Sequence, residues 1–132
     1  LANNDLFRRH GVGKFGLITP YTDDVQTRIL DNYQAAGFDC MAERHLGISD
    51  NYSFSEVTQE QVEAMCREVA EEGAEAISII CTNMRGANLA QRLEAELGVT
   101  VYDSISVVVL RALELAGVNA KRLQGWGRIF AL

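Results

Sequence analysis

The sequence predicts an α/β fold built on a parallel sheet. Short apolar segments alternate with amphipathic helical patterns, and a glycine follows each predicted helix, at positions 37, 73, 98 and 117. Glycine just past a last turn is common helix-ending chemistry, and strands that alternate with helices form parallel sheets. We therefore expect a four-stranded parallel sheet flanked by helices. The length of 132 residues, 48% of them hydrophobic, suits a single domain over residues 1–132.

The first strand and helix follow a short helical end predicted at residues 3–10. Residues 14–21 predict a strand that Pro20 ends, and Thr22 is a good cap for the helix that follows. That helix has apolar residues at helical spacing until Gly37: Val25, Ile29 and Tyr33.

The second unit starts with a strand predicted over residues 38–46. Residues 47–57 are rich in serine, asparagine and aspartate without helical period, which predicts a long loop. Thr58 and Gln61 form a capping box for a helix ending at Gly73. Cys66 lies on its apolar stripe and Cys40 lies within the strand, so both are interpreted as packing residues.

The third and fourth units complete the pattern. Residues 74–81 predict a strand with a helix starting just after Cys81, and residues 99–102 predict a strand before a helix that Ser104 caps. In a parallel sheet these strands end along one rim, where such folds bind their ligands. The tail, residues 118–132, is too short for another unit, and we expect Trp126 to anchor its aromatic segment against the sheet edge or a neighbouring domain.

Cys81 is the most informative residue on this rim. It closes an apolar run and precedes Thr82 and Asn83, which offer hydrogen-bond donors to an anion, so we expect a thiol facing a crevice. The start of the next helix and an inward-turned Arg85 would favour the thiolate. The alternative is a small hydrophobic core residue, which is the commoner role of a lone cysteine.

Composition excludes several function classes. A net charge of −6 with scattered basic residues argues against a nucleic-acid surface. We expect no membrane segment and a cytoplasmic location, because neither a long apolar span nor a leader pattern is present. The three cysteines form no CxxC pair, and His10 and His45 have no metal-like spacing, so we expect no metal site.

Several motifs together carry a family resemblance. They are Thr19-Pro20-Tyr21, Asn51, Cys81-Thr82-Asn83 followed by Arg85, the segment from Val99 to Ser104, and Gly125-Trp126-Gly127-Arg128. In this order they resemble the second half of the aspartate/glutamate racemase superfamily, closest to maleate cis-trans isomerases and arylmalonate decarboxylases. The resemblance runs from about Val12 to Phe130. It implies one flavodoxin-like lobe of a two-lobe protein, with the active site between the lobes and no metal or organic cofactor.

The resemblance also implies roles for individual residues. Cys81 and Tyr21 would be catalytic, with Tyr21 contacting the substrate carboxylate. Thr19, Pro20, Asn51, Thr82 and Asn83 would bind substrate. The decarboxylases lack the asparagine at position 51 and have glycines where this chain has Thr82 and Asn83, which favours an isomerase-like member.

The function expected from this resemblance is a cofactor-independent isomerase or racemase of a small carboxylic acid, maleate-like or amino-acid-like. An arylmalonate-type decarboxylase and a catalytically silent binding or assembly lobe remain alternatives. A receiver-like signalling module is disfavoured, because Cys81 stands where a phosphoacceptor aspartate would be expected. The chain starts at Leu1 without methionine, and we expect the carboxyl-terminal part of a two-lobe enzyme. Its expected partners are an amino-terminal lobe, in cis or in trans, and copies of itself in a homo-oligomer.

Overall fold

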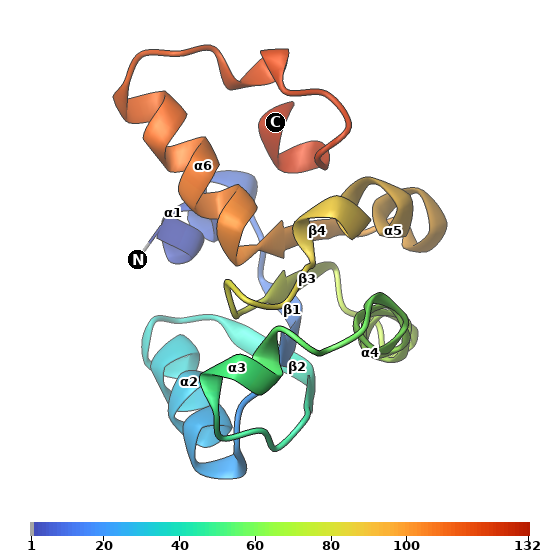
Figure 1. Cartoon of the computed structure of the whole chain (residues 1–132). Helices are drawn as coiled ribbons and strands as arrows, with labels where there is room; N and C mark the ends of the chain where they lie inside the picture. Colours follow the sequence, from blue (N-terminus) through green and yellow to red (C-terminus); the bar gives the residue numbers. More distant parts are fainter. Residues whose placement is uncertain (1) are drawn as a thin grey trace.

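The computed structural model describes residues 2–132, and within them four parallel strands form one sheet in the order β2-β1-β3-β4 (Figure 1). The strands are β1 (Lys14–Thr19), β2 (Asp39–His45), β3 (Ala76–Ile79) and β4 (Thr100–Asp103). The predicted fold class is therefore confirmed. Strands β1 and β3 both end before the predicted residue, because Tyr21 and Cys81 have already left the sheet for the loops of the rim.

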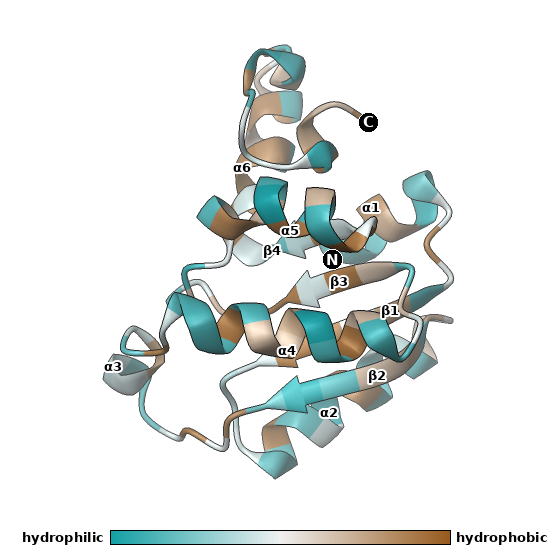
Figure 2. Ribbon diagram, turned by 90° about the vertical axis from the view of Figure 1, so that its right-hand side faces the viewer, coloured by the Kyte–Doolittle hydropathy of each residue, from teal (hydrophilic) through white to brown (hydrophobic). Residues whose placement is uncertain are grey.

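Helices cover both faces of the sheet (Figures 1 and 2). One face packs against α1 (Ala2–His10), α2 (Asp23–Ala35) and α6 (Ser104–Leu115), and the other against α4 (Gln59–Glu71) and α5 (Ala90–Leu97). Among residues 2–132, none of the helices has the length and apolar composition needed to cross a bilayer.

Two apolar cores result, one on each face. Ile18, Ile77 and Ile79 point toward α4 and α5, whereas Phe15 and Leu17 point toward the opposite helices. This alternation follows from the two-residue period of a strand. On the α4 face, a Cβ at Gly16 would lie only 2.6 Å from Val69 Cγ2, so glycine lets α4 approach β1 closely.

The predicted helix ends are confirmed. Gly37, Gly73, Gly98 and Gly117 all have positive φ angles, between 68° and 95°, which glycine adopts without a side-chain penalty. The capping box is also present, since the Gln61 amide donates to Thr58 Oγ1 at 3.2 Å and the Thr58 amide donates to Gln61 Oε1 at 2.9 Å.

Three local predictions are wrong. The predicted loop at residues 47–57 contains a single turn of helix, α3 (Asn51–Phe54), which is too short to show a period in sequence but is capped by Asp50 Oδ1. The helix predicted directly after Cys81 starts later, with η1 (Ala87–Leu89) and then α5. Helix α6 is capped by Asp103 and not by Ser104, because Asp103 Oδ1 accepts from the amides of Ile105 and Ser106.

The tail packs near β4, as expected, but through different residues. It contains η2 (Ala120–Arg122) and η3 (Arg128–Phe130), and Ile129 and Phe130 are buried in the core that α6 covers. Trp126 is 48% exposed, so it does not anchor the tail against the sheet edge, whereas anchoring against a neighbouring domain stays a prediction. The Arg128 guanidinium donates to the carbonyl oxygens of Glu94 and Gly98, which fixes the tail against the end of α5.

Candidate active site

Tyr21 and Cys81 meet at the carboxyl ends of the two central strands. Ile18 of β1 pairs with Ile79 of β3, so the loops that carry both residues leave the sheet side by side. Tyr21 packs against the apolar cluster that contains Cys81, and burial together with the nearby sulfur raises the pKa of Tyr21 to about 12. The ring of Phe54 in α3 packs edge-on against Tyr21, with the centroids 5.3 Å apart. Two predicted catalytic residues therefore lie in contact.

Cys81 is covered by its surroundings. Its side chain is only 5% exposed and belongs to the apolar core under α4 and α5, so the expected open crevice around the thiol is not present in this chain. The expected helix start is also absent, because residues 81–86 form turns before η1. Arg85 is exposed and donates to the Ser55 carbonyl oxygen at 3.4 Å, so its charge is directed toward the end of α3.

The two predicted asparagines are joined directly. Asn83 Nδ2 donates to Asn51 Oδ1 at 2.9 Å and to the Asn51 carbonyl oxygen at 3.1 Å. This pair connects the loop after β3 to the first turn of α3. The structure thus brings Asn51 and Asn83 together, although they are distant in sequence.

Thr19 and Pro20 are buried beneath the rim. Thr19 Oγ1 donates to Gln26 Oε1 at 2.7 Å and accepts from the Tyr21 amide at 3.3 Å. The Pro20 carbonyl oxygen accepts from the Ile48 amide at 2.8 Å. In this arrangement both residues hold the segment that carries Tyr21.

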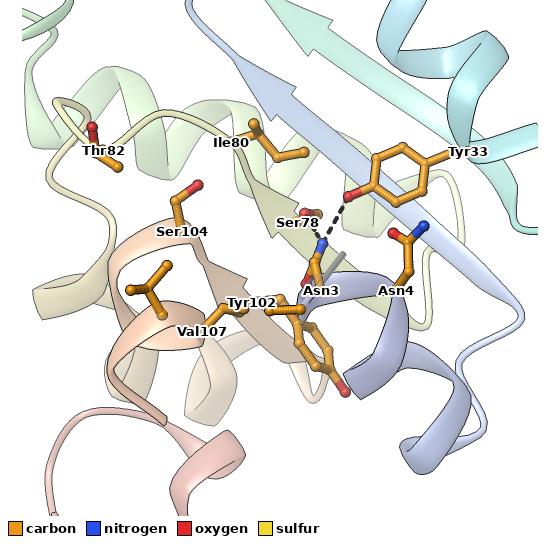
Figure 3. A pocket seen from close by; sticks show the side chains of 11 residues that line it. Asn3, Asn4, Tyr33, Ser78, Ile80, Thr82, Tyr102, Ser104 and Val107 are labelled. Carbon is orange, nitrogen blue, oxygen red and sulfur yellow. Dashed lines mark hydrogen bonds between the residues drawn. The ribbon is translucent and has the colours of Figure 1, made fainter. Parts of the chain in front are cut away.

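Thr82 is exposed and is one of the residues that line the cavity shown in Figure 3. It lines a cavity of about 360 Å³ together with Ser104, Ile80 and Ser78, on the face covered by α1 and α6. Asn3 donates to Ser78 Oγ and to the Tyr33 hydroxyl at the far wall of this cavity. Thr82 is therefore separated from the group formed by Tyr21, Asn51, Cys81 and Asn83.

Asp103 lies at the same rim and is fully buried. Burial raises the pKa of its carboxyl group to about 6, although Oδ1 accepts two backbone amides of α6. Within the described residues Oδ2 has no hydrogen-bond partner. Its role in the structure is therefore to cap α6.

A set of polar residues beneath Tyr21 was missed by the sequence analysis. Gln26 is buried in α2 and bridges Thr19 to Glu43, whose carboxylate also contacts His45. The sequence does contain a signal, because Gln26 occupies the inward stripe that continues with Leu30 and Tyr33. A polar residue on an apolar stripe indicates a buried hydrogen-bond partner.

Groups that could hold a metal ion are not found among residues 2–132, where no three histidine, cysteine or acidic side chains cluster suitably. The other two thiols are those of Cys40 in β2 and Cys66 in α4. Burial raises the pKa of Cys40 to about 11 and that of Cys66 to about 12, which suppresses thiolate formation at both.

The chain is similar in sequence to known proteins. Over 118 residues the chain is 23% identical to the maleate isomerase of Alcaligenes faecalis, covering 89% of this chain and 47% of that protein. Over 125 residues it is 28% identical to the arylmalonate decarboxylase of Bordetella bronchiseptica, covering 93% and 52%. The chain thus spans about half the length of the curated relatives it matches.

Solved structures share the fold. A Nocardia farcinica maleate cis-trans isomerase, crystallised as a cysteine-to-serine mutant with a covalently bound succinylcysteine intermediate, superposes with a TM-score of 0.91 at 22% identity. The match covers 98% of this chain and 53% of the isomerase. A sequence model of the Asp/Glu/hydantoin racemase family matches residues 5–112. The chain therefore belongs to the Asp/Glu/hydantoin racemase family.

Proposed function

We propose that this chain is the cysteine-bearing lobe of an isomerase that acts on a small unsaturated carboxylic acid and needs no metal or organic cofactor. The observation that carries the proposal is the contact between Tyr21 and Cys81 at the ends of adjacent central strands. The Asn51 and Asn83 pair beside it supplies amide groups of the kind that bind a carboxylate.

The proposed reaction begins with the Cys81 thiolate. Its sulfur forms a bond to one alkene carbon of a maleate-like acid, while the π electron pair moves to the neighbouring carbon. The former double bond is then single and can rotate. When that electron pair returns to form the double bond, the carbon–sulfur bond breaks, and the trans acid and the thiolate are released. The succinylcysteine captured in the Nocardia farcinica isomerase corresponds to such an addition product and supports this route.

Tyr21 and the asparagines have distinct proposed roles. Because its pKa is about 12, Tyr21 keeps its proton at neutral pH and can donate a hydrogen bond to a substrate carboxylate or to the sulfur. Asn83 and Asn51 would orient the second carboxylate through their amides. Binding of substrate would have to part their mutual hydrogen bond.

A second lobe is part of the proposal. An isomerase or racemase of this type needs a group on the opposite side of the substrate, and the relatives are about twice as long as this chain. The exposed apolar side chain of Val108 borders the same cavity as Thr82, so an apolar surface adjoins the rim. We propose that the other lobe, in cis or in trans, covers this surface, and that the complete enzyme is oligomeric and cytoplasmic.

The test is covalent capture of maleate by the chain. We expect peptide mass spectrometry to find one added maleic acid on the Cys81 peptide, and none in the Cys81→Ser variant. Cys40→Ser is the matched control and should keep the adduct. An adduct that forms equally on Cys40 and Cys81, or on neither, would overturn the proposal. Carbon dioxide release from an arylmalonate without a maleate adduct would instead favour decarboxylation.

A further inference from the structure

A continuous row of hydrogen bonds runs from the protein surface to Tyr21. His45 Nε2 lies 2.8 Å from Asp23 Oδ1, and His45 Nδ1 lies 2.8 Å from Glu43 Oε2. The row continues inward through two buried side chains. Gln26 Nε2 donates to Glu43 Oε2 at 2.7 Å, and Thr19 Oγ1 donates to Gln26 Oε1 at 2.7 Å.

The direction of every bond in this row is fixed by chemistry. Glu43 as a carboxylate can only accept, so the amide group of Gln26 must turn its nitrogen toward Glu43 and its oxygen toward Thr19. The Thr19 hydroxyl must then donate to Gln26, which leaves its oxygen free to accept from the Tyr21 amide at 3.3 Å. The orientation of one buried amide therefore decides how the Tyr21 segment is held.

His45 is the protonation-sensitive member of the row. Both ring nitrogens face carboxylate oxygens, and only the imidazolium form donates from both. The hydrogen bonds to Asp23 and Glu43 raise the pKa of His45 above its usual value. Asp23 faces it from α2 and Glu43 from β2. The neighbouring Arg44 is paired instead with Glu68 and Glu72 of α4.

We propose that His45, Glu43 and Gln26 are positioning residues that hold Tyr21 against Cys81. Protonation of His45 maintains the hydrogen bonds that fix the orientations of these side chains. Loss of the His45 proton leaves one ring N–H to be shared between Asp23 and Glu43, so the hold of His45 on Glu43 weakens. Gln26 then loses its fixed orientation, and Thr19 no longer holds the Tyr21 amide. The inference rests on the proposed function, because Tyr21 and Cys81 are its target.

The test follows Tyr21 directly, without substrate. In the chain labelled with carbon-13 in its tyrosine rings, we expect the Tyr21 signal, assigned with Tyr21→Phe, to shift with pH at the pKa of His45. His45→Gln should abolish this shift. His10→Gln is the matched control, because His10 is the other of the two histidines in the sequence. It ends α1 and contacts Tyr102 of β4. A Tyr21 shift that persists in His45→Gln would overturn the proposal.

Thr19→Val distinguishes an effect transmitted through the row of hydrogen bonds from a direct effect of the His45 charge on Tyr21. Valine has nearly the same shape but neither donates to Gln26 nor accepts from the Tyr21 amide. We expect His45 to titrate in this variant without any response at Tyr21. A response of unchanged size would overturn the role of Thr19 and Gln26. The Tyr21 signals are measured without maleate. Failure of the maleate-capture experiment can therefore be distinguished from failure of the Tyr21 signal to respond to His45.

Discussion

The side-chain amide of Asn83 donates a hydrogen bond to the side-chain oxygen of Asn51 over 2.9 Å. A second bond from the same nitrogen reaches the Asn51 carbonyl oxygen. One side chain thus fastens α3 to the loop that follows β3. The position of Phe54, and through it the covering of Tyr21, depends on this attachment.

Replacing Asn83 tests that attachment. Asn83→Ala removes both bonds, and because the pair is solvent-accessible we expect a loss of only about 1 kcal/mol in unfolding free energy. Backbone amides of residues 51–57 should exchange with deuterium faster, as measured by mass spectrometry. Asn88→Ala, at an exposed position in η1, is the control and should leave this exchange unchanged. Equal exchange in both variants would mean that α3 is held by other contacts.

The proximity of Cys81 to Tyr21 predicts that replacing the thiol changes the pKa of Tyr21. Because the sulfur contributes to the raised pKa of Tyr21, Cys81→Ser should lower that pKa from about 12. Burial is the larger cause, so the value should stay above the usual 10. Ring carbon shifts across alkaline pH measure it. Cys66→Ser changes a thiol on α4 and should leave the Tyr21 pKa unaltered; a decrease of similar size there would contradict the contact.

Gly86 fills a position that no larger residue can occupy without movement. A Cβ there would lie 2.7 Å from Asp103 Oδ2 and 2.8 Å from Ile79 Cδ1. We expect Gly86→Ala to lower the unfolding free energy by roughly 1–3 kcal/mol, as overpacking does. Urea unfolding checks this. At Gly13 an added Cβ would meet no atom of the described residues within 4 Å, so Gly13→Ala should cost far less.

Asp103 predicts a pH dependence of stability with an unusual sign. Its folded pKa of about 6 exceeds the ordinary aspartate value of 3.8, so the folded state binds the proton more tightly. Stability from this group is present at acid pH and is lost as pH rises from about 4 through 6, by roughly 3 kcal/mol at most. In Asp103→Asn, the temperature of thermal unfolding should depend less on pH over that range.

The control for Asp103 is a second capping aspartate. Asp50 caps α3 through the Ser53 amide, and this bond lowers its pKa. Its stabilisation is therefore present above its unfolded pKa and lost as pH falls through the lower folded value. Asp50→Asn should affect the acid end alone. If both variants change the pH dependence of stability in the same direction, burial is not the cause of the raised pKa at Asp103.

The strands, their parallel order and the glycine helix ends could be predicted because each depends on local chemistry. The apolar runs and Gly37, Gly73, Gly98 and Gly117 carry that information within a few residues. The start of α5 could not be predicted this way. The turns after Cys81 depend on Gly86 fitting against Asp103 and Ile79, which is a contact between distant segments.

The candidate site also combines features that the local sequence predicts with features that depend on contacts between distant segments. Tyr21 and Cys81 could be expected to meet once the strands were ordered, because they follow strands that turn out to be neighbours. Thr82 lies in the turn after Cys81 and lines the cavity on the face covered by α1 and α6, which a motif does not reveal. Gln26 and Glu43 come from α2 and β2, and only tertiary packing shows that they support Thr19.

The sheet order separates the proposed catalytic residues from the residues proposed to position them. Tyr21 and Cys81 follow β1 and β3, the two strands paired on both sides, whereas His45 ends β2 at an edge of the sheet. Edge strands open locally at lower free energy than the centre of a cooperative domain. Substitutions at this edge can therefore alter the proposed support of Tyr21 without disturbing β1 and β3, from which the loops of Tyr21 and Cys81 leave the sheet.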